Sequence, residues 1–245
     1  MIEVNGLCKN YEETEILKNI HLKIQNGEFV AIMGQSGCGK STLLYCVSGM
    51  DRLTTGEVLF EGEKWSELSE REMERRRLTK MGFIFQKANF LKNLSIKDNI
   101  TFPALQAKQY EKKEIMQKAD RLMQKMDIAY VANHDIRKVS GGQLQRAAIC
   151  RALMNDPDIL FGDEPTGALN SSATKEVMDI LNQINQEGTA ILLVTHDAKV
   201  AARADRVIYL EDGCVKDELL LGKYVQASLN EREEKLKHWL ERMGF

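Results

Sequence analysis

A glycine-rich stretch with one lysine is the segment of this chain best suited to chemistry, and it has the form G-x-x-x-x-G-K-[ST]. Its residues are Gly34, Gln35, Ser36, Gly37, Cys38, Gly39, Lys40, Ser41 and Thr42. Glycines let the backbone curl so that several N–H groups point at phosphate oxygens, and a helix that follows adds its positive end. The Lys40 ammonium can then reach the β and γ phosphates, and the Ser41 hydroxyl can ligate Mg²⁺. The stretch therefore predicts a nucleotide phosphate site.

The segments on either side of this loop are suited to hold it in place. The apolar run at residues 29–33 predicts a buried strand, and residues 43–47 are compatible with a helix. Strand, loop and helix in this order are the context in which the motif is meaningful. A chance glycine-rich turn is the simpler alternative, and the strand and the acidic residues further along the chain favour the nucleotide site.

Two acids follow a second apolar run. Residues 158–162 predict a buried strand that ends in Asp163 and Glu164. Ligands of parallel α/β sheets sit at the carboxyl ends of the strands. Asp163 is therefore predicted to hold the Mg²⁺ hydration shell, and Glu164 to polarise the attacking water. Any surface strand can end in Asp-Glu, so the pair alone is weak support.

A second candidate anion site lies at residues 140–143, where Ser140 is a good helix N-cap. Gly141 and Gly142 let a ligand approach the backbone, and Gln143 follows them. A helix interior disfavours two glycines by roughly 1 kcal/mol each. Since the chain already has one phosphate loop, a second anion site facing outward indicates a composite site completed by another copy of the chain.

The order of these motifs resembles that of the ATP-binding subunit of ABC transporters, over nearly all 245 residues. The resemblance implies ATP and Mg²⁺ as cofactors, held by the Walker A loop at residues 34–42, the signature motif at residues 140–143, and Asp163 and Glu164. It assigns adenine stacking to Tyr11, contact with Mg²⁺ and the membrane partner to Gln86, and contact with the γ-phosphate to His196. Glu164, His196, Lys40 and Gln86 are the implied catalytic residues, and Ser41, Gln86 and Asp163 the implied metal site.

Three of these assignments have ordinary alternatives when each residue is taken singly. A lone Gln86 would be a solvated loop residue, and a lone His196 after an apolar strand would be a hydrogen-bonded structural group. A lone Tyr11 would be an edge-strand aromatic.

One position departs from the family pattern: Asn170 stands where the family usually places Asp, which keeps the hydrogen-bonding shape and removes a charge.

Residues 163–169 resemble the branch of the family that contains macrolide exporters, lipoprotein-releasing ATPases and bacitracin-type peptide-resistance transporters. The resemblance implies an ATPase that dimerises on ATP and drives a separate permease at the cytoplasmic face of the membrane. It also implies export of, or resistance to, antimicrobial peptides or other lipophilic compounds. A mechanotransmitting ATPase of cell division or lipoprotein release is the alternative. A soluble ATPase of DNA repair or translation is disfavoured, because the segment between Lys40 and Ser140 is too short for a long coiled coil and there is one cassette.

Composition excludes some partners. The net charge of −2 gives no reason to expect a nucleic-acid surface, and no apolar segment reaches the roughly 18 to 20 residues that span a bilayer. The N-terminus lacks the pattern of a signal peptide. Five cysteines without metal spacing indicate reduced thiols. Cys38 is predicted to have a lowered pKa, because it lies beside a helix N-terminus.

The predicted fold is α/β, a P-loop NTPase of ABC type with a RecA-like core, an antiparallel β lobe and an α-helical lobe. The predicted parts are a β lobe (1–30 and 55–65), a nucleotide-binding core (31–90 and 153–222), a helical lobe with the signature motif (91–152) and a C-terminal helical tail (223–245). Ser69 and Glu72 predict a capping box.

Three groups of apolar residues predict surfaces that pack against another part of the chain or against a partner. One helical face carries Ile115, Ala119, Leu122, Met123 and Met126. The tail places Leu229, Leu236, Leu240 and Met243 on one face, predicted to dock on the chain's own body, with a partner contact as the alternative. A partly exposed groove for the membrane partner is predicted from Gln86 through Phe90, Leu91 and Leu94 toward Ile100 and Phe102.

Overall fold

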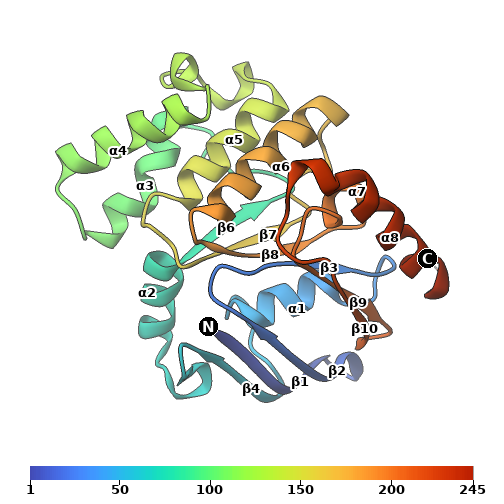
Figure 1. The fold of residues 1–245 in the computed structure, drawn as a ribbon. Coiled ribbons are helices and arrows are strands. Elements are labelled where there is room, and N and C mark those ends of the chain that lie inside the picture. The colour runs from blue at the N-terminus through green and yellow to red at the C-terminus, as the bar shows by residue number, and fades with distance from the viewer. Residues whose placement is uncertain (245) are drawn as a thin grey trace.

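The central sheet of the molecule has six strands in the order β10-β9-β3-β8-β7-β6, with helices on both of its faces (Figure 1). The computed structural model describes residues 1–244, apart from the side chain of Ser66. The strands are β3 (Phe29–Met33), β6 (Met81–Phe85), β7 (Ile159–Asp163), β8 (Ala190–Val194), β9 (Arg206–Glu211) and β10 (Cys214–Leu220). Strands β6, β7, β8, β3 and β9 pair in parallel, and β10 is an antiparallel edge strand. The predicted α/β fold is confirmed.

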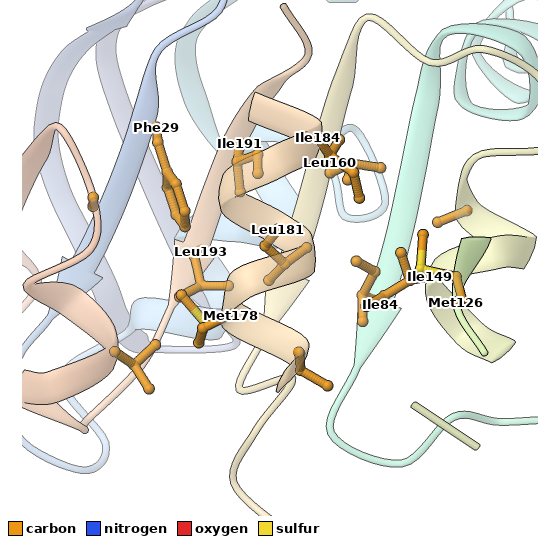
Figure 2. Packing of buried hydrophobic residues seen from close by; sticks show 14 of the residues in the cluster. Phe29, Ile84, Met126, Ile149, Leu160, Met178, Leu181, Ile184, Ile191 and Leu193 are labelled. Carbon is orange, nitrogen blue, oxygen red and sulfur yellow. The ribbon is translucent and has the colours of Figure 1, made fainter. Parts of the chain in front are cut away.

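The core strands are apolar on both faces because both faces are covered. In β3, Phe29, Ala31 and Met33 join one buried cluster, while Val30 and Ile32 join the other. Figure 2 shows the first cluster, in which side chains of α6 (Ser171–Gln186) lie over Phe29 and the neighbouring strands. The second cluster contains residues of α1 (Lys40–Val47), the helix that begins directly after the phosphate loop.

A second, antiparallel sheet has the order β2-β1-β4-β5. Its strands are β1 (Ile2–Tyr11), β2 (Thr14–Ile24), β4 (Thr55–Phe60) and β5 (Glu63–Lys64). Residues of this sheet, of α1 and of the central sheet share one buried cluster, so the predicted antiparallel lobe is packed directly on the central sheet. Strand β3 begins at Phe29, so the boundary predicted after residue 30 falls within a strand of the central sheet.

Helices form most of the segment before β7. They are α3 (Ile96–Ala107), α4 (Lys112–Lys125) and α5 (Gly141–Ala152), with single 3₁₀ turns at Ala129–Val131 and Ile136–Lys138. The apolar face of α4 is confirmed, since Ile115, Ala119, Met123 and Met126 are buried and Leu122 packs against the same cluster. Before them, α2 (Glu70–Lys80) follows the turn Trp65–Glu67 and begins with the predicted capping box of Ser69 and Glu72.

The tail docks on the chain's own body, as the first of the two alternatives predicted. After α7 (Ala198–Ala201) and β10, the turn Gln226–Ser228 leads into α8 (Leu229–Arg242). Leu236 and Leu240 are buried, and Trp239 packs edge-on against Tyr209 at 6.1 Å between ring centroids. The buried Arg232 guanidinium donates to the carbonyl of Ala202 at 2.7 Å. Phe245 lies outside the described residues, and no helix within residues 1–244 is long and apolar enough to cross a membrane.

Register brings the predicted site residues to one edge of the central sheet. Asp163 at the end of β7 pairs with Phe85 of β6 and with Val194 of β8. Val194 pairs in turn with Ile32 of β3. Because these strands are parallel, the residues that follow them, from the phosphate loop to His196, emerge side by side.

Candidate nucleotide site

The phosphate loop wraps around the ammonium of Lys40. Lys40 Nζ donates to the carbonyls of Gly34 at 2.9 Å and Gln35 at 2.7 Å, and the residue is only 7% exposed. Gly34 has φ +151°, and a Cβ at this position would lie 2.1 Å from the carbonyl oxygen of Leu210, so only glycine fits. Gly39, at φ +102°, precedes the first residue of α1, so the helix N-terminus faces the loop.

Asp163 is held by two hydroxyls from α1. Ser41 Oγ donates to Asp163 Oδ1 at 2.8 Å, and the Tyr45 hydroxyl donates to Asp163 Oδ2 at 2.6 Å. Residues four apart lie on one helix face, which is why both reach the end of β7. Burial and the Asp163 carboxylate raise the pKa of Tyr45 to about 12, so its hydroxyl keeps the proton that it donates.

Glu164 and His196 lie together at the ends of β7 and β8. The Glu164 carboxylate is 3.0 Å from His196 Nδ1. Glu164 has φ +46°, a left-handed conformation that costs a non-glycine residue of order 1 kcal/mol and is typical of functional sites. Gln86 is close by, because a Cβ on Gly167 would lie 2.8 Å from Gln86 Nε2 and 3.2 Å from Glu164 Oε2.

Tyr11 is tied to the end of α1 through Asp51. The Tyr11 hydroxyl donates to Asp51 Oδ2 at 2.5 Å, and Lys9 Nζ lies 2.8 Å from Asp51 Oδ1. Burial alone would raise the pKa of Asp51, but the hydrogen bonds from Lys9 and Tyr11 outweigh it and lower the pKa. The bond to Asp51, together with burial, raises the pKa of Tyr11 to about 12.

Several of these groups line one pocket of about 600 Å³. Its walls include Tyr11, Ile16, residues 36–37 and 39–42 of the phosphate loop, Glu164 and His196. The structure therefore brings most of the predicted site residues together, with Asp163 directly behind Ser41.

The signature residues do not line this pocket. Ser140 caps α5, with its N–H donating to Gln143 Oε1 at 2.8 Å and its hydroxyl accepting from the Gln143 N–H at 3.3 Å. Gln143 Nε2 also donates to the hydroxyl of Tyr130 at 2.8 Å. Gly141 and Gly142 lie beside the start of α6, where added Cβ atoms would be 3.6 Å from Leu169 and 3.2 Å from Ala173.

Asn170 has a local structural role. It is the N-cap of α6, where its Oδ1 accepts from the N–H of Ala173 at 2.9 Å. An aspartate would satisfy the same donor. The side-chain oxygen that Asn170 shares with the usual aspartate therefore makes the capping hydrogen bond of α6.

The prediction for Cys38 is wrong. Burial raises the pKa of its thiol and outweighs the effect of Lys40, whose Nζ is 4.0 Å from the sulfur. Cys38 is 9% exposed and joins the second buried cluster, with its sulfur 2.7 Å from where a Cβ on Gly34 would be. The side chain therefore packs into that cluster and does not line the pocket.

The exposure predicted for the residues after Gln86 is confirmed in part, and their role as a docking groove stays a prediction. Leu91 and Phe102 are 45% and 44% exposed, and Phe90 and Leu94 are half-buried. Ile100 is fully buried, so its predicted place in the groove is wrong, because it lies on the face of α3 that packs into the core. A neighbouring pocket of about 480 Å³ lies between β6, α2, α3 and α5, with Phe83, Phe85, Phe102 and Pro103 in its walls.

Sequence reasoning missed Tyr45, Lys9 and Asp51. Tyr45 had one available signal, its position four residues after Ser41 on the same predicted helix. Lys9 and Asp51 gave no signal in the sequence, because 42 positions separate them and only the fold brings them together.

A parallel sheet that carries a phosphate loop, followed by an acidic strand end, defines a P-loop α/β nucleotide-binding protein. A family model described as ABC transporter matches residues 17–167, and the chain belongs to that family as an ATPase cassette.

The chain is 44% identical over 213 residues to the macrolide export ATP-binding/permease protein MacB of Campylobacter jejuni, covering 87% of this chain and 33% of that protein. The chain thus spans about a third of the length of that relative. It is 42% identical to the uncharacterized ABC transporter ATP-binding protein MJ1508 of Methanocaldococcus jannaschii, covering 87% of this chain and 96% of that protein. The dimeric structure of MJ0796, a bacterial ABC transporter cassette, matches with a TM-score of 0.85 and 38% identity, over 91% of this chain and 100% of that one.

Proposed function

We propose that the chain binds ATP with Mg²⁺ in the pocket of about 600 Å³ and hydrolyses it. The observation that supports this most is the convergence of the phosphate loop, Glu164 and His196 on that one pocket. A related dimer of MJ0796 is described as a post-hydrolysis state bound to ADP and Pi.

The side chains fit the roles that hydrolysis requires. Lys40 exchanges its bonds to the loop carbonyls for the β and γ phosphates. Glu164 accepts a hydrogen bond from the attacking water and aligns it, while His196 holds Glu164 and reaches the γ-phosphate. Catalysis of this kind depends on positioning and electrostatic stabilisation, without a covalent intermediate.

The oxygen atoms of Ser41 and Asp163 fit Mg²⁺. They lie 2.8 Å apart beside the loop, and Mg²⁺ prefers a few protein oxygens together with phosphate oxygens and water. Gln86, beside Glu164, is the third proposed ligand. When bound, the ion neutralises charge that develops on the phosphates.

We further propose that two copies close on two ATP molecules. Ser140 and its glycines lie outside their own chain's pocket, so they are available to a nucleotide held by the other copy. The MJ0796 cassette, which is similar to this chain over its full length, has been solved as a dimer. ATP would favour the closed dimer because it contacts both halves.

The work of the cycle is proposed to be transport through a membrane permease, at the cytoplasmic face of the membrane. The exposed Leu91 and Phe102 and the apolar pocket beside them form a surface suited to such a partner. Similarity to the cassette part of MacB supports export of macrolide-like or other lipophilic antimicrobial compounds.

Phosphate release by the purified chain tests the core of the proposal. Lys40→Ala should abolish ATP hydrolysis, because the point charge on the β and γ phosphates is lost. Lys18→Ala, an exposed lysine outside the pocket, is the control and should turn over normally. Turnover by Lys40→Ala at the wild-type rate would refute the assignment of the pocket.

A further inference from the structure

Two side chains, those of Tyr11 and Lys9, converge on the Asp51 carboxylate next to the pocket. Asp51 follows α1, and its N–H donates to the carbonyl of Tyr45 at 3.1 Å, so its position is fixed by the phosphate-loop helix. One carboxylate oxygen accepts from the Tyr11 hydroxyl at 2.5 Å, and the other from Lys9 Nζ at 2.8 Å. Lys9 also donates to the carbonyl of Arg52 at 2.7 Å. The contacts join β1 of the antiparallel sheet to α1.

The side chains of Lys9 and Asp51 are less exposed than the Tyr11 ring that they hold. The Lys9 side chain is 9% exposed and that of Asp51 is 29% exposed, so the ion pair is largely removed from water. Tyr11, which they hold, is 46% exposed and lines the pocket. A buried ion pair is costly unless its hydrogen bonds are satisfied, and here both partners make additional bonds. The exposed ring is therefore anchored by groups that are not themselves exposed.

Lys9 also contacts the aromatic ring of Tyr11. Its Nζ lies 4.5 Å from the centroid of the Tyr11 ring, within the range of a cation–π contact. With the hydroxyl bonded to Asp51 and a cation at the ring, Tyr11 is restrained at both its tip and its π-system. An unrestrained tyrosine would sample three staggered χ1 rotamers.

We propose that Lys9 and Asp51 are positioning residues that hold the Tyr11 ring where it stacks on the nucleobase, and so determine affinity for the base without affecting affinity for the phosphates. The inference rests on the proposed function, because it takes Tyr11 as the stacking residue. Pre-organising the ring means that nucleotide binding does not have to order it. If loss of the clamp leaves about one rotamer in three competent, the apparent Kd rises about threefold.

Calorimetric titration with two probes tests this. ADP carries the base and inorganic pyrophosphate does not, and neither is hydrolysed. Asp51→Ala and Tyr11→Phe should each weaken ADP about threefold and leave pyrophosphate unchanged. Glu57→Gln, which removes the 2.8 Å ion pair with Lys64 in the same sheet, is the control and should change neither. In steady-state assays the two variants should raise KM for ATP and keep kcat.

The combined variant separates positioning from general destabilisation. Since both substitutions remove the same hydrogen bond, Tyr11→Phe with Asp51→Ala should weaken ADP by about the same threefold as either alone. Equal weakening of ADP and pyrophosphate, or unchanged ADP affinity in Tyr11→Phe, would overturn the inference. Should Asp51→Ala fail to fold, Tyr11→Phe decides alone. Failure of the wild-type protein to bind either probe would instead count against the proposed function.

Discussion

His196 Nδ1 lies 3.0 Å from Glu164 Oε1, although 32 positions separate the two residues in the chain. The contact follows from the pairing of β7 with β8, whose carboxyl ends are in register at Asp163 and Val194. The imidazole therefore fixes one oxygen of the carboxylate and leaves the other facing Gln86 and Gly167.

Replacing Glu164 with Gln should keep nucleotide binding and slow hydrolysis at least about a hundredfold, the usual scale for loss of a general base. Phosphate release under saturating ATP gives the rate, and calorimetry with ADP confirms binding. Glu187→Gln, at the far end of α6, is the control. Turnover near the wild-type rate would show that another group orients the water.

With ATP, the Glu164→Gln protein should run as a dimer on gel filtration, and without nucleotide as a monomer. Adding Ser140→Arg should prevent dimerisation, because bulk and positive charge would enter the other copy's phosphate site. Ser140→Ala loses the same helix cap without added bulk and should still dimerise at higher ATP concentration, despite a cost of about 1 kcal/mol to α5. If the Ser140→Arg variant still dimerises with ATP, the signature motif does not lie in the interface.

Tyr45→Phe should lower affinity for ADP with Mg²⁺ about tenfold and leave affinity for ADP in EDTA unchanged. Asp163 would lose the hydroxyl that orients its second oxygen, and such partners of metal ligands affect metal affinity on this scale. Calorimetry with and without Mg²⁺ measures both. Tyr110→Phe, which removes a 3.2 Å hydroxyl contact with Asp156 elsewhere, is the control. Equal losses under both conditions would mean that Tyr45 acts on the nucleotide pocket as a whole.

Cys38 should react slowly with iodoacetamide near neutral pH, and the exposed Cys214 should react first. The thiolate is the reactive form, and a raised pKa means that less of it is present at a given pH. Labelling of Cys38 should accelerate as the pH rises above the ordinary range for a thiol. Peptide mass spectrometry follows each site, with Cys38→Ser and Cys214→Ser identifying the peptides. Fast labelling of Cys38 near pH 7 would contradict its burial.

Leu91→Glu should release the protein from its permease while basal ATP hydrolysis stays within a few-fold. The loop around residue 91 is fixed by Asn99, which bonds the Leu91 N–H at 2.7 Å and its carbonyl at 3.1 Å, so the exposed side chain can change without loss of the fold. Co-purification with a tagged permease is the measurement. Leu220→Glu is the matched control, since Leu220 is 69% exposed on β10, the opposite edge strand from β6. Retention of Leu91→Glu on the permease would exclude this surface.

The sequence predicted those parts of the site that depend on local order. A strand, a glycine-rich loop and a helix are consecutive, so the phosphate site followed from periodicity and glycine spacing. Asp163 and Glu164 were predicted because a parallel strand must end at the ligand edge.

The remaining features depend on contacts between distant segments. The bond of Lys9 to Asp51 exists only once β1 lies against the end of α1. Cys38 was mispredicted because neighbours in sequence indicate a helix N-terminus, while only the path of the loop shows that the sulfur turns inward. Trp239 was overlooked in the tail pattern, although its Nε1 donates to Asp217 at 2.8 Å and its ring is buried.

The position of β3 has a consequence for biosynthesis. Ile32, just before the phosphate loop, pairs with Val194 on one side and with Ile208 on the other, so both neighbours of this strand come from late in the chain. Contacts of such long sequence separation form slowly, because a large loop must close before they are made. During translation the Walker A segment must therefore leave the ribosome without its sheet and wait until residues beyond 208 have emerged. Until then both hydrogen-bonding edges of this strand are unpaired, and this is the interval in which we expect the nascent chain to depend most on chaperones.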